Sequence, residues 1–85
     1  MSEVEVYSTQ LCTHCWRAKD LLENRGIPYT EIDASAPSER QAMVERAGGM
    51  RTVPQIFIGG RHIGGVEELI VLARAGGLDD LTQSG

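Results

Sequence analysis

The chain has 85 residues, of which 8 are basic and 12 acidic, so its net charge is -4 and its isoelectric point lies near 5.0. This sign of charge disfavours a nucleic-acid partner, because phosphate backbones attract basic surfaces. Apolar residues make up 41% of the chain, which is typical of a globular protein, and the length suits one domain over residues 1–85. No apolar run approaches the roughly 20 residues of a membrane span, and the acidic start lacks the apolar core of a signal peptide. We therefore expect a cytoplasmic protein without a membrane partner.

The first part of the chain predicts a strand, a helix and a second strand. Residues 3–7 alternate polar and apolar side chains and contain β-branched valines, which favours a strand. Residues 15–24 combine helix-forming residues with apolar positions, and Gly26 follows as a stop signal. Pro28 then restricts the backbone to extended geometry, and residues 29–33 alternate again.

The second part predicts a helix, a hairpin and a last helix. Pro37 suits a first helical position, and the helix should run over residues 37–47. Residues 55–58 and 61–63 flank two glycines and predict an antiparallel hairpin. Apolar side chains in residues 66–75 follow helical spacing. We expect the tail from residue 78 onward, including residues 79–85, to fray.

The predicted order is therefore β-α-β-α-β-β-α. Two early strands joined through a helix should be parallel with a right-handed crossover, and the hairpin adds an antiparallel pair. This order predicts an α/β fold with a four-stranded mixed sheet flanked by three helices, with helices on both faces.

The chemistry-bearing motif is Cys12-Thr13-His14-Cys15, which runs from the loop after the first strand into the first helix. Cys12 should lie at or just before the helix N-terminus, where free N–H groups and the helix dipole stabilise a thiolate. Cys12 is thus the predicted nucleophile. Cys15 lies one turn on, close enough to attack a mixed disulfide formed at Cys12, and is the predicted resolving thiol.

Two cysteines at this spacing are also typical of half a zinc site. A second half-site is missing, because the remaining nitrogen ligands are His14, between the cysteines, and His62 on the predicted hairpin. The β-α-β setting favours a redox pair.

Three separated segments now carry a resemblance to a known family. They are Cys12 to Cys15 followed by Trp16-Arg17-Ala18-Lys19, then Thr52-Val53-Pro54-Gln55-Ile56-Phe57-Ile58, and then His62-Ile63-Gly64-Gly65-Val66-Glu67-Glu68-Leu69. In this order and at these separations the chain resembles the glutaredoxins over nearly all of its length. The resemblance implies a thioredoxin-like fold and the reduction of glutathione mixed disulfides and protein disulfides, with glutathione as electron donor.

The resemblance also implies a glutathione site. In proteins of this family the bond before the proline matching Pro54 is cis, which would turn the Val53 N–H and C=O outward to pair with a peptide-like ligand beside Thr52. An ordinary proline at a strand start is the alternative.

The start of the last helix would bind the other end of the ligand. Gly65 lets a carboxylate approach the free N–H groups of Val66 and Glu67. By resemblance this is the γ-glutamyl carboxylate, and the Glu67 side chain meets its ammonium group. The alternative is that Glu67 and Glu68 only complement the helix dipole, which we favour for Glu68.

Two arginines are candidates for the glycine carboxylate of glutathione. Arg51 precedes the Thr-Val-Pro segment, and Arg40 lies on the second predicted helix. For Arg40 the alternative is a solvated surface side chain, and Gln41 is a rival at the neighbouring position.

The chain departs from the family around the first cysteine. Many members have Pro and Tyr where this chain has Thr13 and His14, and many have a lysine where it has Thr9. An imidazolium at His14 would favour the Cys12 thiolate; the alternative is an exposed loop residue without effect.

Two further function classes stay open. Relatives without the loop proline can hold a [2Fe-2S] cluster between two subunits, using the first cysteine of each, here Cys12, and two glutathiones. We expect a monomer unless such a cluster is bound. A thioredoxin-like donor served by a reductase is disfavoured by the Gly64-Gly65 helix start, which suits a carboxylate.

Overall fold

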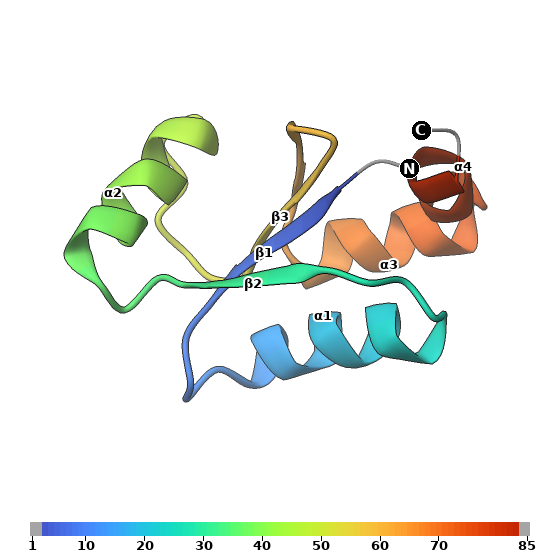
Figure 1. The fold of residues 1–85 in the computed structure, drawn as a ribbon, viewed down its shortest axis with the longest axis horizontal. Coiled ribbons are helices and arrows are strands. Elements are labelled where there is room, and N and C mark those ends of the chain that lie inside the picture. The colour runs from blue at the N-terminus through green and yellow to red at the C-terminus, as the bar shows by residue number, and fades with distance from the viewer. Residues whose placement is uncertain (1–2, 84–85) are drawn as a thin grey trace.

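The chain alternates between strands and helices in the order predicted from the sequence, with one added helix near its end. A computed structural model describes residues 3–83. Its elements are β1 (Val4–Ser8), α1 (Thr13–Asn24), β2 (Thr30–Asp33), α2 (Pro37–Arg46), β3 (Gln55–Ile58), β4 (Arg61–Gly64), α3 (Val66–Arg74) and α4 (Gly77–Gln83) (Figure 1). The predicted order β-α-β-α-β-β-α is confirmed from β1 to α3.

The four strands form one mixed sheet in the order β2-β1-β3-β4. The pair β1 and β2 is parallel, while β3 is antiparallel to both β1 and β4. Gly59 and Gly60 connect β3 to β4 with φ of 59° and 83°, a backbone that two-residue hairpin turns require and that glycine adopts without steric cost. The predicted mixed sheet and hairpin are thus confirmed.

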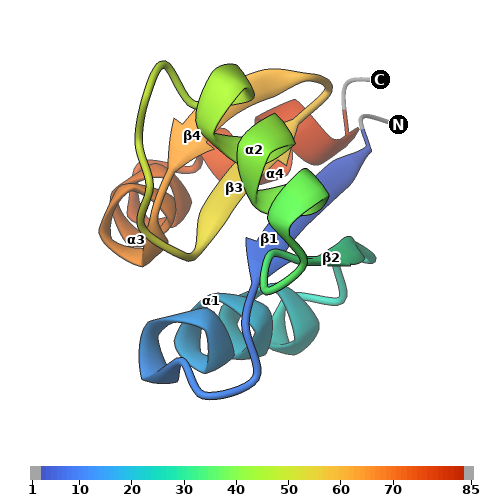
Figure 2. The same cartoon turned by 90° about the vertical axis from the view of Figure 1, so that its left-hand side faces the viewer.

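Helices cover both faces of the sheet, as the order of the elements predicts. On one face α1, α3 and α4 pack against the strands, and the buried residues of this core are Val4, Val6, Ala18, Leu22, Ile27, Ile56, Ile58, Val66, Leu69, Ala73 and Leu78. On the other face α2 places Met43 and Ala47 against Tyr7 and Phe57. A quarter turn brings α2 to the front of the sheet (Figure 2).

The prediction of a frayed tail is wrong for residues 78–83. These residues belong to α4, where Leu78 is fully buried in the core beside α1 and α3. Thr82 Oγ1 donates a hydrogen bond to the Leu78 carbonyl at 2.9 Å, and Asp79 pairs with Arg25 at 3.7 Å. Burial of Leu78 orders a helix too short to be stable alone. The rest of that prediction, residues 84 and 85, lies outside the described residues.

Within residues 3–83, no helix combines the length and the apolar character needed to span a bilayer. The longest of those helices, α1, has 12 residues.

Candidate active site

The first helix begins at a cysteine whose own sulfur caps it. Cys12 is the N-cap of α1 and has an extended backbone, with φ of -138° and ψ of 104°. Its Sγ accepts the Cys15 N–H at 3.1 Å, and its carbonyl accepts the Trp16 N–H at 3.1 Å. The predicted position of Cys12 at the helix start is confirmed. A backbone N–H of the first helical turn thus points at this half-exposed sulfur.

The second cysteine lies one turn into α1 and is completely buried. Burial raises the pKa of the Cys15 thiol to about 12, and its hydrogen bond with Cys12 contributes in the same direction. Both cysteines are free thiols. Cys15 is therefore protonated at neutral pH and close to Cys12, a distribution that matches a nucleophile and a protected partner.

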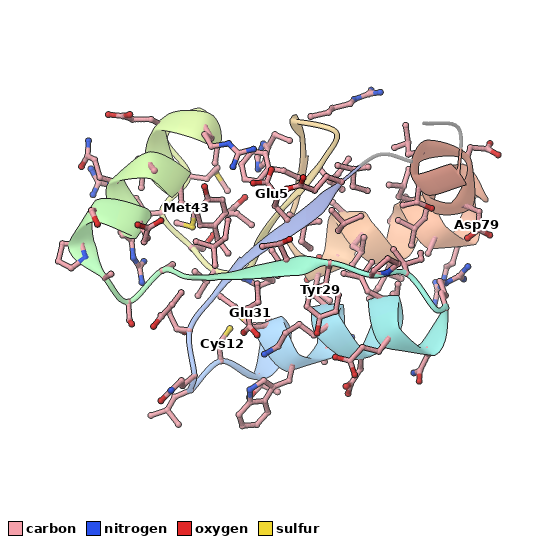
Figure 3. All side chains as sticks on the ribbon, viewed as in Figure 1. Glu5, Cys12, Tyr29, Glu31, Met43 and Asp79 are labelled. Carbon is pink, nitrogen blue, oxygen red and sulfur yellow. The ribbon has the colours of Figure 1, made fainter. Side chains whose placement is uncertain are left out.

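A loop from the far side of the chain meets the Cys12 sulfur. The Val53–Pro54 peptide bond is cis, as the resemblance implied, and Pro54 is buried. Cys12 Sγ lies 3.8 Å from the Val53 carbonyl oxygen, to which its thiol donates. Figure 3 shows the Cys12 sulfur at the start of α1. This contact places the backbone of Val53 beside the predicted nucleophile.

A shallow pocket of about 270 Å³ adjoins this loop. Its lining residues come from three segments, namely His14, Thr52, Val53, Pro54, Gly65, Val66, Glu67 and Glu68. The structure thus brings together the residues predicted for the central part and the γ-glutamyl end of a glutathione site, although they are up to 15 positions apart in sequence.

The start of α3 forms one end of this pocket. Glu68 Oε1 accepts the Gly65 N–H at 2.7 Å, so this carboxylate caps the helix. Among residues 3–83, no acceptor pairs with the N–H of Val66 or Glu67. Gly64 has a φ of 124°, and a Cβ there would lie 2.8 Å from Glu68 Cγ, so the backbone requires glycine at this position.

Comparison with known proteins decides the family. A sequence model described as Glutaredoxin matches residues 4–63. A Pseudomonas aeruginosa protein named Glutaredoxin is 44% identical over 81 residues, covering 95% of this chain and 96% of its own. Glutaredoxin 3 of Escherichia coli is 46% identical over 83 residues, which cover 95% of this chain and 98% of the Escherichia coli protein. The chain belongs to the glutaredoxin family.

Solved structures agree with this assignment. The fold is similar to that of the glutaredoxin chain in a buckwheat glutaredoxin–glutathione complex, with a TM-score of 0.87 and 32% sequence identity. The match covers 98% of this chain and 78% of the buckwheat chain. The fold is also similar to that of a Brucella melitensis glutaredoxin, with a TM-score of 0.84 and 44% sequence identity; the match covers 100% of this chain and 94% of the Brucella chain. The predicted thioredoxin-like fold is thereby confirmed, and membership of the family supports thiol-disulfide oxidoreductase chemistry in general.

The two arginines predicted to bind the ligand lie outside the pocket lining of this glutaredoxin. Arg40 Nη1 donates to the Arg51 carbonyl at 2.8 Å, and Arg40 Nε donates to the Ala34 carbonyl at 3.1 Å. Arg40 therefore links α2 to the loop that leads into Thr52, and Arg51 is exposed. Their contact with a ligand carboxylate stays a prediction.

Sequence reasoning missed a polar network behind the cysteines of the glutaredoxin. Glu31 Oε2 accepts the buried Ser8 hydroxyl at 2.6 Å and pairs with Lys19 Nζ at 2.8 Å. These two donors hold the pKa of Glu31 below its ordinary value, and the Lys19 charge opposes the upward shift in the pKa of Cys15. Lys19 and Glu31 are 12 positions apart, so local spacing carried no signal of this pair.

Proposed function

We propose that this glutaredoxin is a glutathione-dependent thiol-disulfide oxidoreductase with Cys12 as nucleophile and Cys15 as resolving thiol. The observation that carries the proposal is the Cys12 sulfur itself, which is half-exposed, accepts a helical N–H at 3.1 Å and lies 3.8 Å from the Val53 carbonyl at the pocket. A sulfur so placed at a helix start can act as a nucleophile, and it is reached from the side on which a ligand would lie.

On a glutathionylated protein, the Cys12 thiolate attacks the glutathione sulfur. The Cys12–glutathione disulfide forms, and the protein leaves as a thiolate that takes up a proton. A second glutathione thiolate then attacks the glutathione sulfur of that disulfide. Glutathione disulfide leaves and the Cys12 thiolate is restored, so each cycle oxidises one glutathione thiol and converts one mixed disulfide into a protein thiol and glutathione disulfide.

On a protein disulfide, Cys12 attacks one sulfur and forms a mixed disulfide with the protein. The first protein sulfur leaves as a thiolate and takes up a proton. Cys15 then attacks Cys12 Sγ, its proton passes to the second protein sulfur as that sulfur leaves, and a Cys12–Cys15 disulfide remains. Two glutathiones reduce that disulfide and become glutathione disulfide. Burial raises the pKa of Cys15 to about 12, which keeps this thiol protonated in the reduced protein.

The pocket supports glutathione as the ligand. Among residues 3–83 no acceptor pairs with the Val53 N–H, so this group is available for a peptide-like ligand. The unpaired N–H groups of Val66 and Glu67 suit the γ-glutamyl carboxylate, and Glu67 is exposed where it can meet the ammonium group. Thr52 and Pro54 complete the lining at the reacting end. The buckwheat relative, a complex with glutathione, further supports this ligand.

The surface around the nucleophile supports protein substrates as partners. Leu11 is 95% exposed and Trp16 is 49% exposed, and they lie directly before Cys12 and one turn after it. Apolar residues at these two positions often pack on each other as a hydrophobic staple. Leu11 is too exposed for that, so its apolar side chain is available to a partner. Exposed apolar side chains beside a reacting sulfur support contact with a polypeptide. We further propose that the reaction takes place in the reducing cytoplasm, where cysteines stay free thiols.

The two-cysteine assignment is tested by single substitutions. Cys12→Ser should abolish thiol transfer. Cys15→Ser should keep much of the activity on a small glutathione mixed disulfide, because glutathione resolves that intermediate, and should lose reduction of protein disulfides. Equal losses in both variants on both substrates would refute the assignment. The purified protein is also inspected for colour, since a brown dimer with little activity would favour the [2Fe-2S] alternative at Cys12.

The ligand site is tested at the start of α3. A Cβ at Gly65 would lie 3.4 Å from Glu68 Oε1 and 3.5 Å from the Pro54 carbonyl, which are ordinary contacts, so the fold should accept a side chain. Gly65→Val should nevertheless raise the KM for glutathione more than Glu68→Ala, because it adds bulk where the carboxylate approaches. An unchanged KM in folded Gly65→Val would place the site elsewhere.

A further inference from the structure

We propose that Gln55 is a positioning residue for glutathione, because its side-chain amide fixes the direction in which the Val53 N–H points. The inference rests on the proposed function above and adds a residue that makes no contact with the reacting sulfurs. Gln55 begins β3 and is only 1% exposed. It does not line the pocket.

Both ends of the Gln55 amide are engaged. Nε2 donates to the Thr52 carbonyl at 2.9 Å and lies 3.3 Å from Thr52 Oγ1, while Oε1 lies 2.6 Å from His62 Nε2. A carbonyl can only accept, so the NH₂ group must face Thr52. Oε1 then accepts, and His62 Nε2 must carry a proton in either charge state of the ring. The amide therefore has one orientation.

The partner on β4 is itself held in place. The His62 ring packs on the Phe57 ring with centroids 5.0 Å apart, and Phe57 is buried between the sheet and α2. Arg46 of α2 also lies over the Phe57 ring, 4.1 Å from its centroid. Gln55 is thus anchored to the rigid part of the sheet, and it transmits that rigidity to the loop at Thr52.

The anchor determines the direction of the next N–H. Within residues 3–83 only the Val53–Pro54 peptide bond is cis, so the preceding Thr52–Val53 peptide bond is trans. In a trans peptide the C=O and the N–H point in opposite directions. Since the Thr52 carbonyl points inward to buried Gln55, the Val53 N–H points away from it, on the side of the pocket that Val53 lines.

The same residue then presents two groups with two tasks. The Val53 carbonyl lies at the Cys12 sulfur, 3.8 Å away, and the Val53 N–H is left for the ligand backbone. A rotation of the Thr52–Val53 peptide would remove the N–H from the ligand without moving Cys12. Gln55 is therefore expected to act on ligand binding and not on the reactivity of the nucleophile.

The test separates positioning from a purely structural role. Gln55→Met fills the same buried space and removes both hydrogen bonds. It should raise the KM for a small glutathione mixed disulfide roughly 3- to 10-fold, which is the range for loss of one ligand hydrogen bond. The rate of Cys12 alkylation by iodoacetamide should stay as in the unaltered protein, and the Val53 amide signal should no longer shift when glutathione is added.

Two variants complete the experiment. Ile56→Val, at the next buried position of β3, destabilises the fold without touching the amide network and should leave the KM unchanged. Gln55→Glu keeps the size and the partner of His62 but places an oxygen against the Thr52 carbonyl, so it should raise the KM even if Gln55→Met does not fold.

The outcomes are distinct. A KM that is unchanged in a folded Gln55 variant, or raised as much by Ile56→Val, would overturn the inference and leave the proposed function intact. If the unaltered protein itself neither binds nor uses glutathione, the proposed function fails and the inference fails with it.

Discussion

Cys15 should resist alkylation at neutral pH far more strongly than an ordinary thiol. The perturbation is iodoacetamide, which reacts with thiolates. Burial and the contact with Cys12 raise the pKa of Cys15 from 9.0 to about 12. At pH 7 about one Cys15 in 100,000 is ionised, against about one in 100 for a thiol at 9.0, because each pH unit below the pKa lowers the thiolate fraction about tenfold. The structure therefore predicts a reaction about 1,000-fold slower, before steric protection is added.

The assay uses Cys12→Ser, in which Cys15 is the remaining thiol and burial, the larger cause of the shift, is kept. Alkylation is followed by mass spectrometry between pH 6 and 9, and the same variant unfolded in guanidinium chloride serves as the control. The folded rate should rise about tenfold with each pH unit across this range, without levelling near 9. A folded rate within about tenfold of the unfolded rate would refute the argument from burial.

Three further outcomes are expected. Thr9→Lys should lower the KM for glutathione, more at low than at high salt, because salt screens exposed charges; equal effects at both salt concentrations would contradict this. Arg46→Met should reduce the free energy of unfolding in urea by about 1 to 2 kcal/mol, since it removes a cation 4.1 Å from the Phe57 centroid and a 2.8 Å pair with Glu5. Leu78→Ala should cost about 2 to 5 kcal/mol, and a loss near zero would show that α4 does not contribute to the folded unit.

Alternation, helical spacing and the Gly and Pro signals between segments located the elements from β1 to α3, including β2, none of whose residues is fully buried. They missed α4 for a physical reason. Gly76-Gly77 is a strong stop signal, and a seven-residue helix is not stable by itself. Its stability comes from Leu78, which packs against helices that begin far earlier in the chain. Short elements that depend on tertiary burial are poorly predicted from local pattern.

The position of Cys12 at the helix start could be predicted from local pattern, and the cis bond before Pro54 from the family resemblance. The partners of Gln55 and Arg40 could not. The hydrogen bonds of Gln55 need a hairpin in register with His62, and Arg40 reaches a carbonyl 11 positions away across a loop. Such contacts depend on how elements pack, so the sequence indicated Arg40 as a ligand residue, where the structure gives it a backbone partner.

The cap of α1 is made by the reacting atom, and this ties folding to the redox cycle. A thiolate at Cys12 is a strong acceptor for the Cys15 N–H, whereas a sulfur in a disulfide is neutral and accepts weakly. The first turn of the helix therefore loses part of its cap whenever Cys12 is oxidised. By thermodynamic linkage, a hydrogen bond from the Cys15 N–H that is stronger in the reduced protein also favours reduction of Cys12. Each turnover therefore ends in the redox state in which the first turn of α1 is better capped.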